Sequence, residues 1–208
     1  MIKFNRDILL DIFLRLLSCV FVGYFIVALL GAYNADKTRT TLIAAIFSEV
    51  ATVVVSLLSR RTLIRDWNPL IIVGTAYASS LWFLLINVTT VSHILPETPA
   101  LALQFFAAIW TINAKVTLGR SFGWLPANRG VVDTGVYRII RHPIYFGYAL
   151  SHIGFLLANF NIQNALVLAT VYVSQIYRLL QEEKFLIKDP AYRAYTAKVP
   201  YRLIYGIF

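Results

Sequence analysis

The sequence predicts an all-α, polytopic integral membrane protein with about six transmembrane helices, the last two forming a C-terminal helical hairpin. Hydrophobic residues make up 59% of the 208 residues, whereas soluble domains have about 45–50%. The mean hydropathy is +0.68, and apolar runs of the length that crosses a bilayer recur along the chain. We therefore expect one membrane domain over residues 1–208, with the N-terminal spans in residues 1–117 and a functional region in residues 118–208.

The first four predicted spans follow one another closely. Apolar runs predict helices near residues 8–31, 41–58, 69–91 and 97–117. Pro69 suits the first turn of the third helix, because proline lacks the backbone N–H that would be unpaired there. A bilayer core of about 30 Å needs about 20 helical residues, so each run is interpreted as a membrane span.

The second half of the chain is predicted to be a polar loop followed by a hairpin. Residues 119–142 are rich in glycine, proline and polar residues, which indicates a structured loop outside the hydrocarbon. Pro143 opens an apolar segment that ends near Phe160, and a second one covers about residues 162–180. Asparagines between them indicate a tight turn. The tail Gln181–Phe208 is expected to lie along the membrane interface as an amphipathic helix.

The charge distribution predicts the topology. The chain has 19 Lys and Arg against 10 Asp and Glu, a formal net charge of +9. These basic residues lie between apolar runs, so anionic lipid headgroups account for them and no nucleic acid partner is expected. With the N-terminus inside, the outer loops carry only Lys37 and Arg39. Both termini, the 119–142 loop and the tail are therefore predicted to be cytoplasmic.

No metal site is expected from the sequence. Cys19 is the one cysteine and lies in an apolar run, which is typical of a buried packing residue. The three histidines, His93, His142 and His152, have no zinc-ligand spacing around them.

The segment Gly135–Tyr148 is the most informative feature, because it places arginines, a histidine and tyrosines at the mouth of an apolar protein. About forty residues later come two adjacent glutamates and then a spaced pair of tyrosines. Arginine and histidine bind carboxylates or phosphates, tyrosine rings suit an adenine or a sulfonium, and glutamates accept hydrogen bonds from ribose or ammonium groups. This inventory fits S-adenosylmethionine, and it would also suit a nicotinamide dinucleotide.

The order and spacing of RHPxYxG, EE and YxxY resemble the isoprenylcysteine carboxyl methyltransferases, a membrane family related to the phospholipid N-methyltransferases. The resemblance covers roughly residues 118–202. It implies a cytosolic pocket for S-adenosylmethionine between the loop and the tail, and a lipophilic acceptor that enters from the bilayer. The cofactor-binding residues that it implies are Tyr137, Arg141, His142, Tyr145, Gly147, Glu183, Tyr192 and Tyr195.

The resemblance also implies an acceptor. In the isoprenylcysteine enzymes the acceptor is a carboxylate that basic side chains orient. The basic residue before Val199-Pro200 matches Lys198 here, and the following arginine is displaced to Arg202. Together with Glu182, these two residues are the catalytic candidates. Alignment and desolvation of the nucleophile would carry most of the catalysis.

Other functions stay open from the sequence. A phospholipid or a small thiol is an alternative methyl acceptor. An NADPH-dependent membrane reductase is an alternative enzyme, because sterol reductases share a similar C-terminal pocket design. A transporter or non-catalytic scaffold would need Arg15, Glu49 and the His142 loop to line one path. Glu49 lies mid-span, where a charge is costly, so it is expected to line a substrate cavity or to pair with Arg15.

Overall fold

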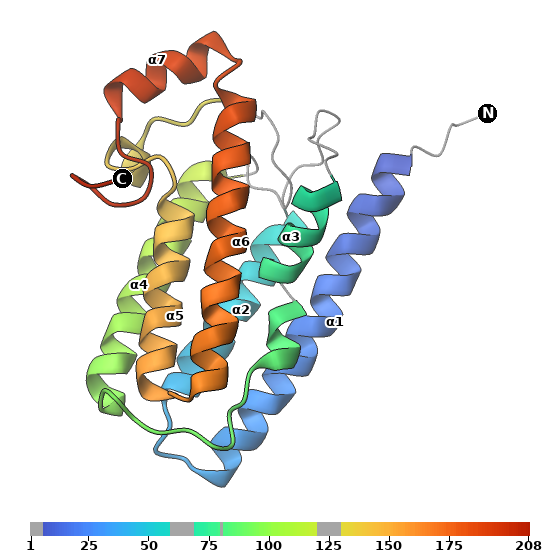
Figure 1. Ribbon diagram of the computed structural model, residues 1–208, viewed down its shortest axis with the longest axis vertical. Helices are drawn as coiled ribbons and strands as arrows, with labels where there is room; N and C mark the ends of the chain where they lie inside the picture. The colour runs from blue at the N-terminus through green and yellow to red at the C-terminus, as the bar shows by residue number, and fades with distance from the viewer. Residues whose placement is uncertain (1–5, 59–68, 80, 120–129) are drawn as a thin grey trace.

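The computed structural model describes residues 6–58, 69–79, 81–119 and 130–208. Its helices stand side by side as a bundle, and α7 crosses one end of it close to the C-terminus (Figure 1). The all-α prediction is confirmed for the described residues. The elements are α1 (Arg6–Ala35), α2 (Thr41–Leu58), α3 (Pro69–Ser79), η1 (Leu81–Leu85), α4 (Glu97–Leu118), η3 (Gly135–Arg138), α5 (Pro143–Ala158), α6 (Ile162–Leu186) and α7 (Pro190–Lys198).

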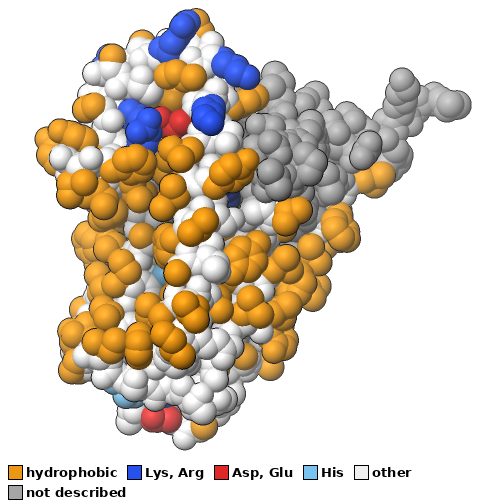
Figure 2. Space-filling model, viewed as in Figure 1, with side chains coloured by type: hydrophobic (Ala, Val, Ile, Leu, Met, Phe, Trp, Pro, Cys, Tyr) orange, Lys and Arg blue, Asp and Glu red, His pale blue; other side chains and the backbone are white. Residues whose placement is uncertain are grey.

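The outer surface indicates membrane association. Two helical stretches among the described residues are long and apolar enough to cross a bilayer, Arg15–Ala35 and Glu97–Leu118, and Thr41–Val55 and Pro143–Ala158 are shorter apolar helices. Figure 2 shows hydrophobic side chains along the flanks of the bundle and Lys and Arg side chains gathered at the end that carries α7. The count of six spans and the cytoplasmic orientation of that end stay predictions.

The predicted helix over residues 69–91 is wrong beyond its first half. The α-helix ends at Ser79, and a short 3-10 helix over Leu81–Leu85 follows before the chain becomes irregular. Asn87 lies beyond this break, and its side-chain Oδ1 accepts hydrogen bonds from the backbone N–H groups of Thr89 and Thr90 at 2.9 and 3.2 Å, so the chain after η1 does not resume a helix. Asparagine side chains compete with helical hydrogen bonds in this way.

The C-terminal hairpin is confirmed, but its second helix is longer than predicted. Asn161 caps α6, because its Oδ1 accepts from the backbone N–H of Asn164 at 2.7 Å. The helix then runs to Leu186 instead of ending near residue 180. Glu182 and Glu183 therefore lie on the last turns of a rigid helix. The predicted amphipathic tail helix is confined to α7, whose cap Asp189 accepts from the N–H of Ala191.

Small residues let α4 and α5 approach closely. The face of α5 that meets α4 carries Gly147, Ser151, Gly154 and Ala158, all buried. A Cβ added at Gly147 would overlap Oγ1 of Thr111 on α4. Small residues at this spacing allow close backbone packing of membrane helices. This contact fixes the beginning of α5 and so positions the loop that precedes it.

A polar network ties the opposite end of the bundle together. Arg39 is buried, and it donates to the backbone oxygen of Val88 at 2.7 Å and to Oδ1 of Asn159 at 2.6 Å. Glu97 at the start of α4 accepts from the backbone N–H of Thr41 at 2.9 Å. Arg39 is thus part of the packed structure rather than a free loop charge, and the network anchors the hairpin turn against α2 and α4.

Two charged residues lie deep among the helices. Lys115 on α4 is buried and donates to Oγ1 of Thr52 on α2 at 2.7 Å. Its positive charge acts on Glu49, which lies one turn before Thr52. The guanidinium of Arg15 donates to the backbone oxygen of Leu57 at 3.2 Å. Lys115 is therefore a charge close to Glu49 that the sequence analysis did not anticipate.

Candidate active site

The segment before α5 is held by the C-terminal tail. The short helix η3 begins at Gly135, whose φ of +54° lies in the left-handed region that favours glycine. The backbone N–H groups of Arg141 and His142 then donate to the carbonyl oxygens of Tyr201 and Arg202 at 2.9 and 2.8 Å. Two segments sixty residues apart in the sequence are therefore joined by backbone hydrogen bonds.

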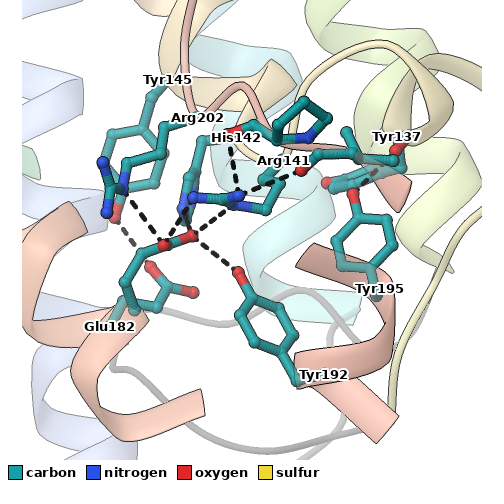
Figure 3. Close-up of polar contacts among 11 residues, drawn as sticks. Tyr137, Arg141, His142, Tyr145, Glu182, Tyr192, Tyr195 and Arg202 are labelled. Carbon is teal, nitrogen blue, oxygen red and sulfur yellow. Dashed lines mark hydrogen bonds and ion pairs between the residues drawn. The ribbon is translucent and has the colours of Figure 1, made fainter. Parts of the chain in front are cut away.

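Glu183 is the centre of the site, because four side chains form hydrogen bonds with its carboxylate. Figure 3 labels these four, which are Arg141, His142, Tyr192 and Arg202. Its Oε1 lies 2.9 Å from Nε of Arg141, 2.9 Å from Nε2 of His142 and 2.8 Å from the hydroxyl of Tyr192. Its Oε2 accepts from Nη2 of Arg141 at 2.8 Å and from Nε of Arg202 at 3.2 Å. The forked guanidinium of Arg141 thus binds the carboxylate through two parallel hydrogen bonds, the strongest geometry for such a pair.

The same arginine also binds the tail directly. Nη1 of Arg141 donates to the backbone oxygens of Val199 and Pro200, each at 3.0 Å. Arg141 is buried, as are His142 and Glu183. Arg141 therefore links the loop, α6 and the tail through all its donor nitrogens, and we call the group of Arg141, His142, Glu183, Tyr192 and Arg202 the Glu183 cluster.

The cluster stabilises the charged form of its carboxylate. Burial alone would raise the pKa of Glu183, but the hydrogen bond and charge of His142 and the hydrogen bonds from Arg141 and Tyr192 lower it well below its ordinary value of 4.5. Burial and the nearby Glu183 charge raise the pKa of the Tyr192 hydroxyl above its ordinary range. Glu183 therefore stays ionised and Tyr192 stays a hydrogen-bond donor at neutral pH.

This shift predicts an acid sensitivity. A carboxyl whose folded pKa is depressed contributes stability above its unfolded pKa, and this contribution is lost as the pH falls toward the folded value. We expect the thermal midpoint of the detergent-purified protein to fall below about pH 4.5. A titration from pH 7 to pH 3 measures this, and a Glu183→Gln variant should show a weaker decline over the same range. An equal decline would contradict the assignment to Glu183.

Two further tyrosines, Tyr195 and Tyr137, join α7 to the loop that begins at η3. The hydroxyl of Tyr195 donates to the backbone oxygen of Tyr137 at 2.7 Å, and both side chains are buried. The ring of Tyr195 packs with Tyr192 and Val199 in a small apolar cluster beneath α7. Tyr137 packs with Ala114 on α4. These two tyrosines fix α7 against the loop that begins at η3.

Tyr145 and Glu182 form a second polar group beside the cluster. The Tyr145 hydroxyl donates to Oε2 of Glu182 at 3.1 Å. The guanidinium of Arg178, one turn earlier on α6, lies 5.6 Å from the centre of the Tyr145 ring, and the ring of His142 meets that of Tyr145 edge-on. Glu182 is half-buried, unlike its neighbour Glu183. The Tyr145–Glu182–Arg178 group therefore combines an aromatic face, a carboxylate and a cation at one place.

The structure brings together most of the residues predicted from the sequence. Two lie apart from the cluster. Lys198 is exposed in the last turn of α7, and no hydrogen bond joins it to the Glu183 cluster among the described residues. Gly147 lies against Thr111, so helix packing already accounts for a glycine there. Arg202 lies in the cluster, where it contacts Glu183 and the Phe208 ring.

Some contributors were missed by the sequence analysis. Nε1 of Trp110 donates to the backbone oxygen of Pro143 at 2.9 Å and fixes the first turn of α5. Its ring also meets Phe146 edge-on. The carbonyls of the Val199–Arg202 segment are equally important, because four of them bind Arg141 and His142. The amino-acid sequence does not show which backbone carbonyls will accept such hydrogen bonds. Only the structure therefore identifies the carbonyls of the Val199–Arg202 segment.

The donor set fits S-adenosylmethionine, but through fewer residues than predicted. The polar atoms of Arg141 and Glu183 are engaged with each other and with the tail, so these residues build the site. The Tyr145–Glu182–Arg178 group offers what the ligand needs: a carboxylate for ribose hydroxyls or the ammonium, a guanidinium for the carboxylate, and an aromatic face for the sulfonium.

Comparison with known families agrees with this chemistry. The model of the phospholipid methyltransferase family matches residues 98–193, from the beginning of α4 into α7. This region, a little under half of the chain, is therefore similar to that family, which is part of the membrane methyltransferase group related to the isoprenylcysteine carboxyl methyltransferases. The family implies a methyltransferase with S-adenosylmethionine as methyl donor. No curated protein matches the sequence.

Proposed function

We propose that the protein transfers a methyl group from S-adenosylmethionine to a lipophilic acceptor at the membrane. The convergence of Arg141, His142, Glu183, Tyr192 and Arg202 on one carboxylate carries this proposal. These residues come from separate parts of the chain, and most of them lie in the region that matches a methyltransferase family. A scaffold protein has no need of such a cluster beside an open carboxylate and an aromatic face.

One group of these residues holds the site together, and another group would bind the cofactor. The Glu183 cluster holds the loop, the end of α6 and the tail in one arrangement, which preorganises the site. Glu182 would accept hydrogen bonds from the cofactor, Arg178 would bind its carboxylate, and the Tyr145 ring would face the sulfonium. When bound, S-adenosylmethionine supplies an electrophilic methyl group. The apolar bundle below excludes water from the nucleophile and so favours its attack.

The first candidate acceptor is a carboxylate of the isoprenylcysteine type. Its support is the sequence resemblance, with Lys198 and Arg202 as the basic side chains that would orient the anion. Arg202 is well placed for this, since its side chain is partly exposed while it contacts Glu183. Lys198 is exposed on α7, so it would reach an acceptor only at the interface.

The second candidate acceptor is a phospholipid amine. The observation that favours it is the family match, because the matching model describes phospholipid methyltransferases. An amine does not need basic side chains to orient it, so this candidate does not depend on Lys198. Both acceptors share the same donor site and differ only in the headgroup that would enter from the bilayer.

Calorimetry with detergent-purified protein tests the donor site. We expect micromolar binding of S-adenosylmethionine, weakened about tenfold or more in Glu182→Gln because a charge-assisted hydrogen bond contributes about 1.5–3 kcal/mol. Lys188→Ala, an exposed residue of the same end of the bundle, is the matched control and should bind normally. Binding of NADPH instead would support a reductase. Binding of neither ligand by folded protein would favour the transporter or scaffold.

A further inference from the structure

A second group of polar side chains lies on the membrane side of the donor site, between α5 and α6. His152 on α5 is two helical turns beyond Tyr145, about 10 Å along the axis. Its Nδ1 lies 2.9 Å from the hydroxyl of Tyr172 on α6. Tyr172 in turn lies about three turns before Glu182. The donor site and this pair therefore occupy successive levels of the same two helices.

The His152 ring lies among aromatic rings. Trp82 of η1 meets it edge-on with ring centres 4.9 Å apart, Tyr148 stacks at 6.5 Å, and Tyr172 lies at 5.9 Å. The side chain is half-buried. Within the described part of the chain, Nε2 of His152 has no hydrogen-bond partner. One ring nitrogen is thus fixed by Tyr172 and the other is available.

A buried amide close by is also incompletely satisfied. Gln175 lies one turn after Tyr172 on α6 and is 6% exposed. Its Oε1 is buried without a hydrogen-bond partner among the described residues. A buried acceptor of this kind costs free energy unless a ligand or water satisfies it. Along α6, Gln175 thus lies at a level between Tyr172, the partner of His152, and Glu182 of the donor site.

The charged groups nearest to His152 belong to α4 and α2. The ammonium of Lys115 lies 5.0 Å from the centre of the Tyr148 ring, which separates it from His152. Lys115 also lies close to Glu49 on α2. The groups that directly face the imidazole are the phenols of Tyr148 and Tyr172 and the indole of Trp82. No other ionisable side chain among the described residues forms a hydrogen bond, an ion pair or a ring contact with it.

We propose that His152 is the proton acceptor for a protic acceptor headgroup, bound between α5 and α6 with Gln175 as a hydrogen-bond acceptor. The inference rests on the proposed methyl transfer and names the acceptor chemistry that this subsite serves. The proposal assigns the proton of the neutral imidazole to Nδ1, which then donates to the Tyr172 hydroxyl and leaves the lone pair of Nε2 for the headgroup.

An amine headgroup must lose a proton before its nitrogen can attack the methyl group. Nε2 of His152 takes one proton from the headgroup ammonium and frees the nitrogen lone pair. That lone pair forms the new N–C bond while the C–S bond of the donor breaks, and its electron pair stays on sulfur. The proton on His152 is later released to water. A carboxylate acceptor arrives without a proton, so it would need neither His152 nor the open oxygen of Gln175.

The test compares His152→Gln with wild-type protein in nanodiscs of phosphatidylethanolamine and phosphatidylcholine. Methyl transfer from labelled S-adenosylmethionine is measured from pH 6 to pH 9. We expect His152→Gln to bind the cofactor within about twofold of wild type and to lose about 100-fold in kcat, the lower range for a general base. The residual rate of His152→Gln should rise more steeply with pH than the wild-type rate, because the headgroup must then lose its proton to water before it attacks, a dependence that a merely structural role would not produce.

Two control variants distinguish the loss of a proton acceptor at His152 from a general effect of changing a histidine. His93→Gln changes a histidine at the opposite end of the bundle, where the imidazole is 45% exposed, and should leave the rate unchanged. Tyr172→Phe removes the partner of Nδ1 and should lower the rate less than His152→Gln does. An unaltered rate and pH profile in His152→Gln would overturn the proposal.

The same experiment separates this inference from the proposed function. A second set of nanodiscs carries a prenylated N-acetylcysteine in phosphatidylcholine. Methylation of that carboxylate alone, at equal rates in wild type and His152→Gln, would overturn the role of His152 and leave the methyltransferase intact. Failure of wild-type protein to bind S-adenosylmethionine at all would instead overturn the proposed function.

Discussion

Replacing Glu183 with glutamine is expected to cost about 3–5 kcal/mol of stability, because it leaves the Arg141 charge buried without its partner. The carboxylate takes part in five hydrogen bonds with four side chains. A glutamine offers one acceptor oxygen and turns an NH₂ group toward donors. The thermal midpoint in detergent and the binding of S-adenosylmethionine should both fall, because the loop, α6 and the tail would no longer be held together.

The adjacent glutamate provides a matched comparison. Glu182→Gln removes the same charge one residue away, but the carboxylate of Glu182 is half-buried and accepts from the Tyr145 hydroxyl. We expect a stability loss of about 1 kcal/mol, the usual net value of one such hydrogen bond. Its main effect should be on cofactor binding. If both variants lost the same stability, Glu183 would not be the residue that organises this end of the bundle.

Replacing Gly147 with alanine is expected to separate α4 from α5. The new methyl group would overlap Oγ1 of Thr111 and lie 3.3 Å from Cδ1 of Trp110. Overpacking of this kind typically costs about 1–3 kcal/mol. Activity should fall as well, since Trp110 holds the first turn of α5 through the backbone oxygen of Pro143. Thermal unfolding and the transfer rate measure the two effects.

A second substitution tests the cause. Thr111→Ala in the Gly147→Ala background removes the clashing oxygen, so part of the lost stability should return, with a coupling of about 0.5–3 kcal/mol. Gly31→Ala on α1 is the matched control, because nothing lies within 4 Å of the added Cβ. It should be neutral or slightly stabilising. Equal losses at Gly31 and Gly147 would show that helix propensity, and not the contact with Thr111, sets the effect.

Much of the architecture follows from local signals. Composition and apolar periodicity were enough to predict α2, α4 and the α5–α6 hairpin, because each is bounded by proline, asparagine or a polar turn. The third predicted span ends early, at Ser79, and Asn87 further along forms hydrogen bonds with the backbone that follows it, which keeps the chain irregular there. The end of α6 was misplaced because Glu182 and Glu183 are good helix formers, although their charge suggested a break.

Composition, apolar runs and the spacing of the polar motifs were enough to predict a helical membrane protein that carries the residues of a methyltransferase. The sequence by itself could not decide which of those residues build the site and which are free to bind a ligand. That division depends on distances across the fold: Glu183 faces inward to Arg141 and Tyr192, whereas Glu182, one residue earlier on the same helix, faces Tyr145. Adjacent helical residues point about 100° apart, and only tertiary packing fixes which of the two directions is buried.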